Sequence, residues 1–263
     1  MSEITFRSDM TVGLIDHMGG DESVLRAMLV ASDKDDPSEW LMTTTVKNRG
    51  RINALMRDRH GSPFEHNSMT FYVEAPIFVF REWHRHRIGV SINEQSGRYS
   101  ELPPMFYLPP RHRPLIKVDG TKQMDYVSED ASDEQYARKI EGDKRVMIAC
   151  YEEYQRQLDD GIVKESARNC LPVAIYSKMY WTCNARSLMA FLSLRVRAEP
   201  FWIENGPDDD LYFKQPGGAM FPSKPQWEIN QCADQMERLA EECFATLFPV
   251  TYEAFIANGR VAP

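Results

Sequence analysis

Two long stretches with the apolar spacing of an α-helix limit what this chain can fold into more than any other feature. They cover residues 132–158 and 226–248. In the second stretch the apolar positions follow one helical face: Ile229, Cys232, Met236, Leu239 and Cys243. Residues 69–73 and 175–182 predict strands, the first of them rich in aromatic and β-branched side chains. Since long helices must bury their apolar faces against another layer, we expect an α/β fold with a mixed or antiparallel sheet packed by long helices.

Local signals predict further element boundaries. Asp21 is the predicted N-cap of a helix, and Asn184 is the predicted N-cap of a helix that runs to Leu194. Pro76 suits the first turn of a helix that reaches about Arg87. Residues 88–99 predict an irregular loop after that helix.

The length of 263 residues fits one large domain or two small ones. We expect a single domain over residues 1–263 with two loop excursions. The first excursion, at about 111–135, is polar and is broken by Pro114 and Gly120. The second, at about 198–225, is rich in proline and glycine, which is typical of a long loop or a small insertion rather than a domain.

The overall charge excludes several classes of partner. The formal net charge is −8 and the pI is about 5.4, which argues against a general nucleic-acid or anionic-membrane binder. No apolar run approaches the ~20 residues that span a bilayer, and the N-terminal residues show no signal-peptide pattern. The five cysteines form no C-x-x-C pair, which predicts reduced thiols. We therefore expect a soluble, cytoplasmic protein that binds neither nucleic acid nor membrane.

One segment of this acidic chain concentrates cations. Its charged and polar residues are, in order, Arg85, His86, Arg87, Glu94, Gln95, Ser96 and Arg98. Such a cluster suits a pocket for a small anion, although cations are also favoured at a solvated helix C-terminus. A metal site on His84 and His86 is disfavoured because the surrounding arginines would repel a cation, so we expect no metal.

Several blocks carry a resemblance to a known family. The blocks are Arg85-His86-Arg87 followed after eight residues by Ser96, His60–His66, Ala75–Val79, Ala167–Pro172, Trp181–Arg195 and Gln226–Ile229. In this order they resemble the motifs of the flavin-dependent thymidylate synthases, over roughly residues 10–257. The resemblance implies that family's fold and the conversion of dUMP to dTMP, with methylenetetrahydrofolate as one-carbon donor and NADPH-reduced FAD as hydride source. It also implies a homotetramer whose active sites draw on more than one subunit.

The resemblance also implies roles for individual residues on the nucleotide side. Arg98 and Arg168 would bind the nucleotide phosphate, because the arginine fork matches phosphate and is always charged. Arg195 would face the uracil as a catalytic residue. Ser96, the other catalytic candidate, is favoured as a substrate binder over a nucleophile, because no base is dictated by spacing. The full substrate-binding set is Glu82, Arg85, Glu94, Gln95, Ser96, Gly97, Arg98, Arg168 and Arg195.

A second set would hold the flavin. It comprises His60, Ser62, Glu65, Arg85, His86, Arg87, Ile88, Asn184, Arg186 and Leu194. No G-x-G-x-x-G follows a strand, so a Rossmann site is not supported. Ala190 and Lys224 depart from the family pattern, which leaves a non-catalytic flavin- or nucleotide-binding homologue as the alternative. An RNA-binding module is disfavoured by the acidic balance.

Overall fold

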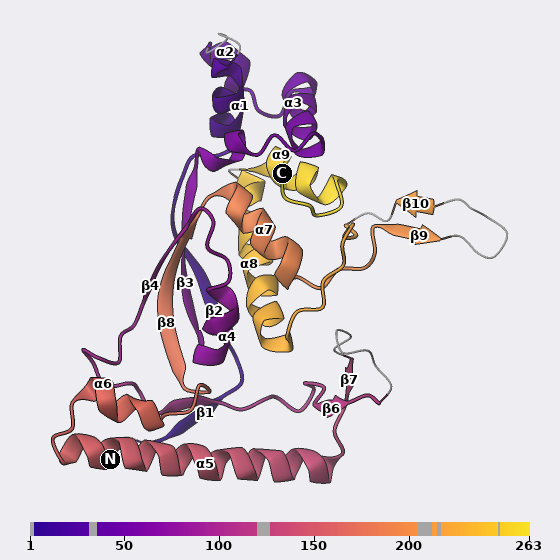
Figure 1. Ribbon diagram of the computed structural model, residues 1–263. Helices are drawn as coiled ribbons and strands as arrows, with labels where there is room; N and C mark the ends of the chain where they lie inside the picture. The colour runs from indigo at the N-terminus through magenta and orange to yellow at the C-terminus, as the bar shows by residue number, and fades with distance from the viewer. Residues whose placement is uncertain (1–2, 32–35, 120–126, 205–211, 215–216, 247) are drawn as a thin grey trace. The chain divides into compact units, whose positions relative to one another are not determined.

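The computed structural model (Figure 1) describes residues 3–31, 36–119, 127–204, 212–214, 217–246 and 248–263, with the main chain alone for 202–204, 212–214 and 240–246. The helices are α1 (Asp21–Val30), α2 (Pro37–Trp40), α3 (Val46–Arg57), α4 (Ile77–Trp83), α5 (Asp133–Asp159), α6 (Lys164–Ala167), α7 (Ala185–Arg195), α8 (Trp227–Thr246) and α9 (Pro249–Ala257), with 3-10 turns η1 (Ser62–Glu65) and η2 (Arg168–Cys170). The strands are β1 (Thr5–Arg7), β2 (Thr11–Met18), β3 (Ser68–Pro76), β4 (Val90–Glu94), β5 (Met105–Tyr107), β6 (Ile116–Lys117), β7 (Ser128–Glu129), β8 (Tyr176–Cys183), β9 (Trp202–Glu204) and β10 (Tyr212–Lys214).

The chain forms two compact units, and neither is a continuous stretch of sequence. The first unit comprises Met1–Thr11, Val73–Arg85 and Asn93–Met179, and the second comprises Val12–Tyr72, His86–Ile92 and Tyr180–Pro263. The basic cluster is divided between them, since Arg85 belongs to the first unit and Arg87 to the second. The expectation of a single domain stays a prediction.

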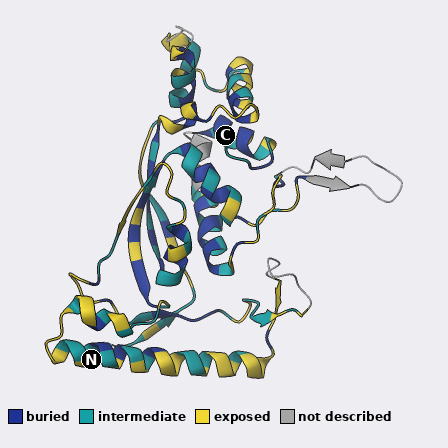
Figure 2. Ribbon diagram, viewed as in Figure 1, coloured by how far each residue is buried: buried dark blue, intermediate teal, exposed yellow. Residues whose placement is uncertain are grey.

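Four strands form the main sheet in the order β2-β3-β8-β4. Of the shorter pairs, β1–β5 is parallel, whereas β6–β7 and β9–β10 are antiparallel. Buried side chains alternate with less buried ones along β3 and β8 (Figure 2), as expected for strands with one face on a core. Both strands lie where the sequence predicts them, and the predicted α/β class, with a mixed or antiparallel sheet and long helices, is confirmed.

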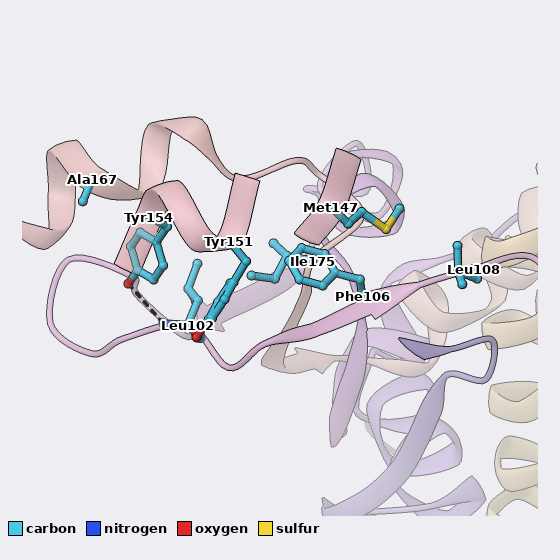
Figure 3. Close-up of a cluster of buried hydrophobic side chains, with 8 residues drawn as sticks. All are labelled: Leu102, Phe106, Leu108, Met147, Tyr151, Tyr154, Ala167 and Ile175. Carbon is cyan, nitrogen blue, oxygen red and sulfur yellow. Dashed lines mark hydrogen bonds between the residues drawn. The ribbon is translucent and has the colours of Figure 1, made fainter. Parts of the chain in front are cut away.

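A long helix and a cluster of aromatic side chains form the core of the first unit. Ser132 caps α5, because its Oγ accepts a hydrogen bond from the N–H of Gln135 at 3.2 Å while Gln135 Oε1 accepts from the N–H of Ser132 at 2.9 Å. Gly161 follows the helix with a φ of 82°, which glycine adopts without steric cost. Figure 3 shows the cluster beside α5: Leu102, Phe106, Leu108, Met147, Tyr151, Tyr154, Ala167 and Ile175.

The core of the second unit is built on α7. Asn184 caps this helix as predicted, accepting a hydrogen bond from the N–H of Ser187 at 2.9 Å. Phe191 lies against Trp181 of β8 with ring centroids 5.4 Å apart, and Trp181 lies 6.1 Å from Phe71 of β3. These large, fully buried side chains fix α7 on the strands of its own unit.

Asp21 does not cap its own helix, contrary to the prediction. Gly20 occupies the N-cap position of α1, and Asp21 is only 1% exposed. Its carboxylate accepts hydrogen bonds from the N–H groups of Val250 (2.7 Å) and Thr251 (3.0 Å) and from Thr251 Oγ1 (2.6 Å). Asp21 therefore satisfies the first turn of α9, and burial raises the pKa of its carboxyl to about 6.

Two further predictions are wrong in their boundaries. α4 ends at Trp83, so Arg85, His86 and Arg87 follow the helix instead of forming its last turn. Residues 90–94 form β4 at an edge of the main sheet, where a loop is predicted. The helix predicted over residues 226–248 is confirmed as α8, and α9 is a further helix that the sequence analysis does not predict.

The two expected excursions carry only short strands in their described parts, the β6–β7 pair and the β9–β10 pair. Cys150, Cys170, Cys183 and Cys232 carry free thiols, and the side chain of Cys243 lies outside the described residues. Within the described ranges, no helix is long and apolar enough to cross a membrane.

Candidate active site

Arg85, His86 and Arg87 lie in the turns between α4 and β4. Arg85 and Arg87 are exposed, and neither forms an ion pair within the described part of the chain. His86 is less exposed than either neighbour. The two arginines are therefore available to an anionic ligand, while the histidine between them is engaged within its unit.

In the first unit, β4 leads into the turn that carries Ser96, Gly97 and Arg98. The N–H of Gln95 donates to the carbonyl of Lys178 in β8 at 2.8 Å, which ties the start of the turn to the sheet. Ser96 Oγ accepts from the N–H of Arg98 at 3.3 Å. No general base contacts Ser96 Oγ among the described residues, so its geometry suits a substrate binder better than a nucleophile.

One arginine, Arg98, lies in this turn, and another, Arg168, lies beside it. Arg98 Nε donates to Glu165 Oε2 at 2.8 Å, and both side chains are about half exposed, so the pair is weak and solvent-screened. Arg168 lies against Gly97: a Cβ at position 97 would be 3.2 Å from Arg168 Cδ. The Arg168 guanidinium forms no ion pair with any described residue. Because position 97 is glycine, there is room beside the turn for Arg168, whose guanidinium is not neutralised by an ion pair with a described residue.

Two buried tyrosines of α5 fix the main chain that follows the turn. Tyr151 OH donates to the carbonyl of Leu102 at 3.1 Å, and the N–H of Leu102 donates to Tyr154 OH at 3.4 Å (Figure 3). Burial raises the pKa of Tyr151 to about 12, so its hydroxyl stays protonated at neutral pH and can donate this hydrogen bond. The Leu102 side chain would itself lie 3.2 Å from a Cβ on Gly97. α5 thus supports the turn through contacts that the sequence analysis does not assign.

Glu94 is held in place at the end of β4. Ser177 Oγ of β8 donates to Glu94 Oε1 at 2.9 Å, and His84 Nε2 lies 3.7 Å from Glu94 Oε2. Glu82 is half-buried in the last turn of α4. Ser177 and His84 are neighbours of Glu94 that the sequence analysis does not assign to the nucleotide site, and the contact of Ser177 depends on the register of β8.

In the second unit, His86 contacts Arg195. Arg195 Nε donates to His86 Nε2 at 3.0 Å, and the imidazole packs edge-on against Phe191 with centroids 4.9 Å apart. Burial, together with the positive charge of Arg195, lowers the pKa of His86 to about 4. The imidazole is therefore neutral at physiological pH and acts as a hydrogen-bond acceptor for the predicted catalytic arginine.

Arg186, in the first turn of α7, is held by two acceptors. Its Nη1 donates to Glu65 Oε1 at 2.5 Å, and its Nε donates to the main-chain oxygen of Pro263 at 2.7 Å. Its Nη2 makes no hydrogen bond with a described residue. Glu65 is thus a partner of Arg186 within the second unit, and its predicted contact with the flavin stays a prediction.

An open pocket of about 330 Å³ lies at the N-terminus of α7. It is lined by Asn67, Ser68, Gly89, Val90, Ser91, Thr182, Cys183 and Asn184. Asn67 Oδ1 accepts from the N–H of Ala185 at 2.7 Å, which fixes the helix end. Gly89 has a φ of 65°, and a Cβ there would lie 2.6 Å from Ser187 Oγ, so the chain passes close to α7 only as glycine. A helix N-terminus beside such a pocket favours an anionic ligand.

The remaining predicted flavin contacts are exposed side chains of the second unit. They are His60, Ser62, Ile88 and Leu194. Ile88 is 89% exposed, and its carbonyl accepts from Ser187 Oγ at 2.8 Å. Such exposed apolar groups offer surface to a bound ring.

Each unit therefore presents cations and main-chain groups suited to an anionic ligand. No set of three or more His, Cys, Asp or Glu side chains gathers as a metal site in the described ranges. The fold and these two sets of residues define an α/β protein equipped for phosphate-bearing ligands.

Comparisons with known proteins give the family. The family model described as thymidylate synthase complementing protein matches residues 13–245. A flavin-dependent thymidylate synthase from Streptomyces avermitilis is 46% identical over 260 residues, 98% of this chain and 96% of that protein. The corresponding protein from Tropheryma whipplei (strain TW08/27) is 43% identical over 260 residues, 98% and 97% of the two chains.

A solved structure agrees with both sequence comparisons. The UMP/dUMP methylase PolB from Streptomyces cacaoi, bound with 5-Br UMP, superposes with a TM-score of 0.81 at 42% identity and covers 99% of this chain and 100% of that chain. The chain belongs to the family of flavin-dependent thymidylate synthases. The predicted family, its fold and its enzyme class are confirmed.

Proposed function

We propose that this enzyme converts dUMP to dTMP, using methylenetetrahydrofolate as one-carbon donor and FAD, reduced by NADPH, as the source of the hydride. The observation that carries the proposal is that each unit holds its own uncommitted anion-binding groups. In the first unit these are Arg168 and the outer nitrogens of Arg98, and in the second they are Arg186 Nη2 and the exposed Arg87. A nucleotide phosphate and a flavin pyrophosphate are the two anions that this chemistry requires.

The nucleotide would bind at the turn after β4. Arg98 and Arg168 would bind the phosphate, because two arginine forks match its oxygens and its charge. Ser96 and the main chain of Glu94–Gly97 would add hydrogen bonds. Arg195, oriented by neutral His86, would face the uracil, where a fixed cation stabilises negative charge on the ring.

The flavin would bind at the N-terminus of α7. The open pocket there, the free Nη2 of Arg186 and the exposed Arg87 fit a pyrophosphate, and exposed Ile88 and Leu194 fit an apolar ring. When bound, the flavin would supply the hydride to the nucleotide. The residues of this chain bind and orient the two ligands.

UMP is a second candidate substrate. The structural relative from Streptomyces cacaoi is described as a UMP/dUMP methylase and was solved with 5-Br UMP and with 5-Br dUMP. The relatives named thymidylate synthases favour dUMP. An assay must therefore offer both nucleotides at equal concentration and compare kcat/KM.

The visible absorption spectrum of the purified protein tests the proposal first. We expect flavin bands that NADPH bleaches without air, and dTMP formation once dUMP and methylenetetrahydrofolate are added. Arg168→Ala should abolish nucleotide turnover and keep the flavin bands. Arg138 is an exposed arginine of α5, and Arg138→Ala should behave as the unchanged protein. Flavin and nucleotide binding without product would instead support a non-catalytic homologue.

We also propose a homotetramer, on the strength of the family resemblance. Four chains of 30.4 kDa give 4 × 30.4, or about 122 kDa. Light scattering coupled to gel filtration measures this mass directly, and a monomeric mass in an active preparation would contradict it.

A further inference from the structure

The residues after α9 follow a fixed path. α9 ends at Ala257, and after the C-cap Asn258 come Gly259 at a φ of 73° and Arg260 at a φ of 55°. The N–H of Gly259 donates to the carbonyl of Ile256 at 3.1 Å, and the N–H of Arg260 donates to that of Phe255 at 2.9 Å, which closes the helix end. The Arg260 side chain, only 7% exposed, forms an ion pair with Glu237 of α8. Such a helix end sets the direction of the three residues that follow it.

Two arginines from distant parts of the second unit hold those three residues. Arg59, just after α3, donates from Nη1 to the carbonyl of Ala262 at 2.6 Å. Arg186, in the first turn of α7, donates from Nε to the main-chain oxygen of Pro263 at 2.7 Å. Pro263 is itself buried. Residues 261–263, here called the strap, therefore join the ends of α3 and α9 to the start of α7.

The strap is one of three contacts that confine the Arg186 guanidinium. Pro263 accepts from Nε, Glu65 accepts from Nη1, and Nη2 makes no hydrogen bond with any described residue. The guanidinium also lies over Gly61, where an added Cβ would be 2.5 Å from both Arg186 Cζ and Nε. An arginine held in this way loses less conformational freedom when it binds a ligand than a free arginine does.

We propose that the strap is part of the flavin site: through the main-chain oxygen of Pro263 it positions Arg186 so that Nη2 is presented to the flavin pyrophosphate. The inference rests on the proposed function, because it takes Arg186 as a flavin ligand. Residues 261–263 are positioning residues, since they act through Arg186 and contact no ligand. Glu65 has the same role through Nη1 of the guanidinium.

The test compares flavin binding by the protein of residues 1–263 and by a shortened protein that ends at Arg260. Both proteins are stripped of flavin, and the Kd for FAD is measured by quenching of flavin fluorescence. Loss of a hydrogen bond that orients a charged donor should weaken FAD binding about tenfold. Binding of dUMP at saturating FAD should be unchanged, because the printed contacts of the strap are with Arg59 and Arg186 and with none of the proposed nucleotide ligands.

Gly61→Ala provides a variant that removes no group from the strap. The clashing atoms are the far end of a flexible side chain, so the guanidinium should move aside at little cost in thermal stability while FAD affinity falls by a similar factor. Gly50→Ala is the matched control, because a Cβ at position 50 of α3 meets nothing within 4 Å. This variant keeps the inference falsifiable even if the shortened chain fails to fold.

Arg186→Met completes a double-mutant cycle. If the strap acts through Arg186, shortening the chain in the Arg186→Met background should cause no further loss of FAD affinity. Equal losses in both backgrounds, or unchanged affinity in both the shortened chain and Gly61→Ala, would overturn the inference alone. Unchanged FAD affinity in Arg186→Met itself would overturn the proposed flavin site, and with it the inference.

Discussion

Arg195 Nε lies 3.0 Å from His86 Nε2, which accepts its hydrogen bond as a neutral imidazole. The contact joins His86, which lies between Arg85 and Arg87, to an arginine at the end of α7. The two positions are 109 residues apart in the sequence. Edge-on packing against Phe191 fixes the plane of the imidazole. The neutral imidazole orients the arginine without adding a negative charge of its own.

Removing the His86 acceptor should therefore reduce catalysis. We expect His86→Ala to lower kcat about tenfold, since a hydrogen bond to a charged group contributes roughly 1.5–3 kcal/mol. Glutamine offers a neutral oxygen in place of Nε2, so His86→Gln should recover part of the loss. The rate of dTMP formation at saturating FAD and dUMP measures both effects, and equal losses in the two variants would show that the hydrogen bond is not what matters.

The lowered pKa of His86 also predicts a pH dependence of stability. Between its unfolded value near 6.5 and about 4 in the fold, the unfolded chain binds the proton and the folded chain does not. This contribution to stability is therefore complete above about pH 6.5 and is lost as the pH falls towards 4. The loss should be on the order of 2 kcal/mol. Urea unfolding at pH 7, 6 and 5 measures the free energy of unfolding. As the pH falls, this free energy should decrease less for His86→Gln than for the unchanged chain.

Gly97→Ala should weaken nucleotide binding specifically. The added Cβ would lie 3.2 Å from both Arg168 Cδ and the Leu102 side chain, and Leu102 is fixed by two tyrosines. Arg168 is the neighbour that can move, so we expect the Kd for dUMP to rise about fivefold to tenfold. Titration calorimetry measures this change. Gly142→Ala on α5, where a Cβ meets nothing within 4 Å, is the control, and a comparable rise in that variant would refute the specific role of Arg168.

Features with a local cause are predictable from this sequence. The boundaries at Ser132 and Asn184 follow from side chains that cap their own helices. The two central strands follow from their apolar pattern. The order of the motifs likewise indicates the family, because this order is read from the sequence without knowing which motifs contact one another in the fold.

Features that depend on long-range partners are not predictable in this way. β4 lies at a sheet edge with mostly exposed side chains, so it lacks the apolar alternation that marks a strand. Asp21 looks like a cap for its own helix, but its partners Val250 and Thr251 are about 230 residues away. The contact between Arg186 and Pro263 leaves no local signal at either residue. The roles of the individual site residues stay predictions.

The buried carboxyl of Asp21 should give a pH dependence opposite in sign to that of His86. Its pKa is raised from 3.8 to about 6, chiefly by burial, so the folded chain binds a proton more tightly than the unfolded chain between these values. The contribution of Asp21 therefore falls as the pH rises from about 4 to 6 and is constant above. Asp21→Asn cannot titrate, so its unfolding free energy relative to the unchanged chain should rise over that interval, by on the order of 2 kcal/mol. Any constant offset reflects the altered hydrogen bonds to α9 and does not affect the slope. Asp16→Asn, at an exposed position in β2, is the control, and a pH-independent difference for Asp21→Asn would mean that the carboxyl stays charged in the fold.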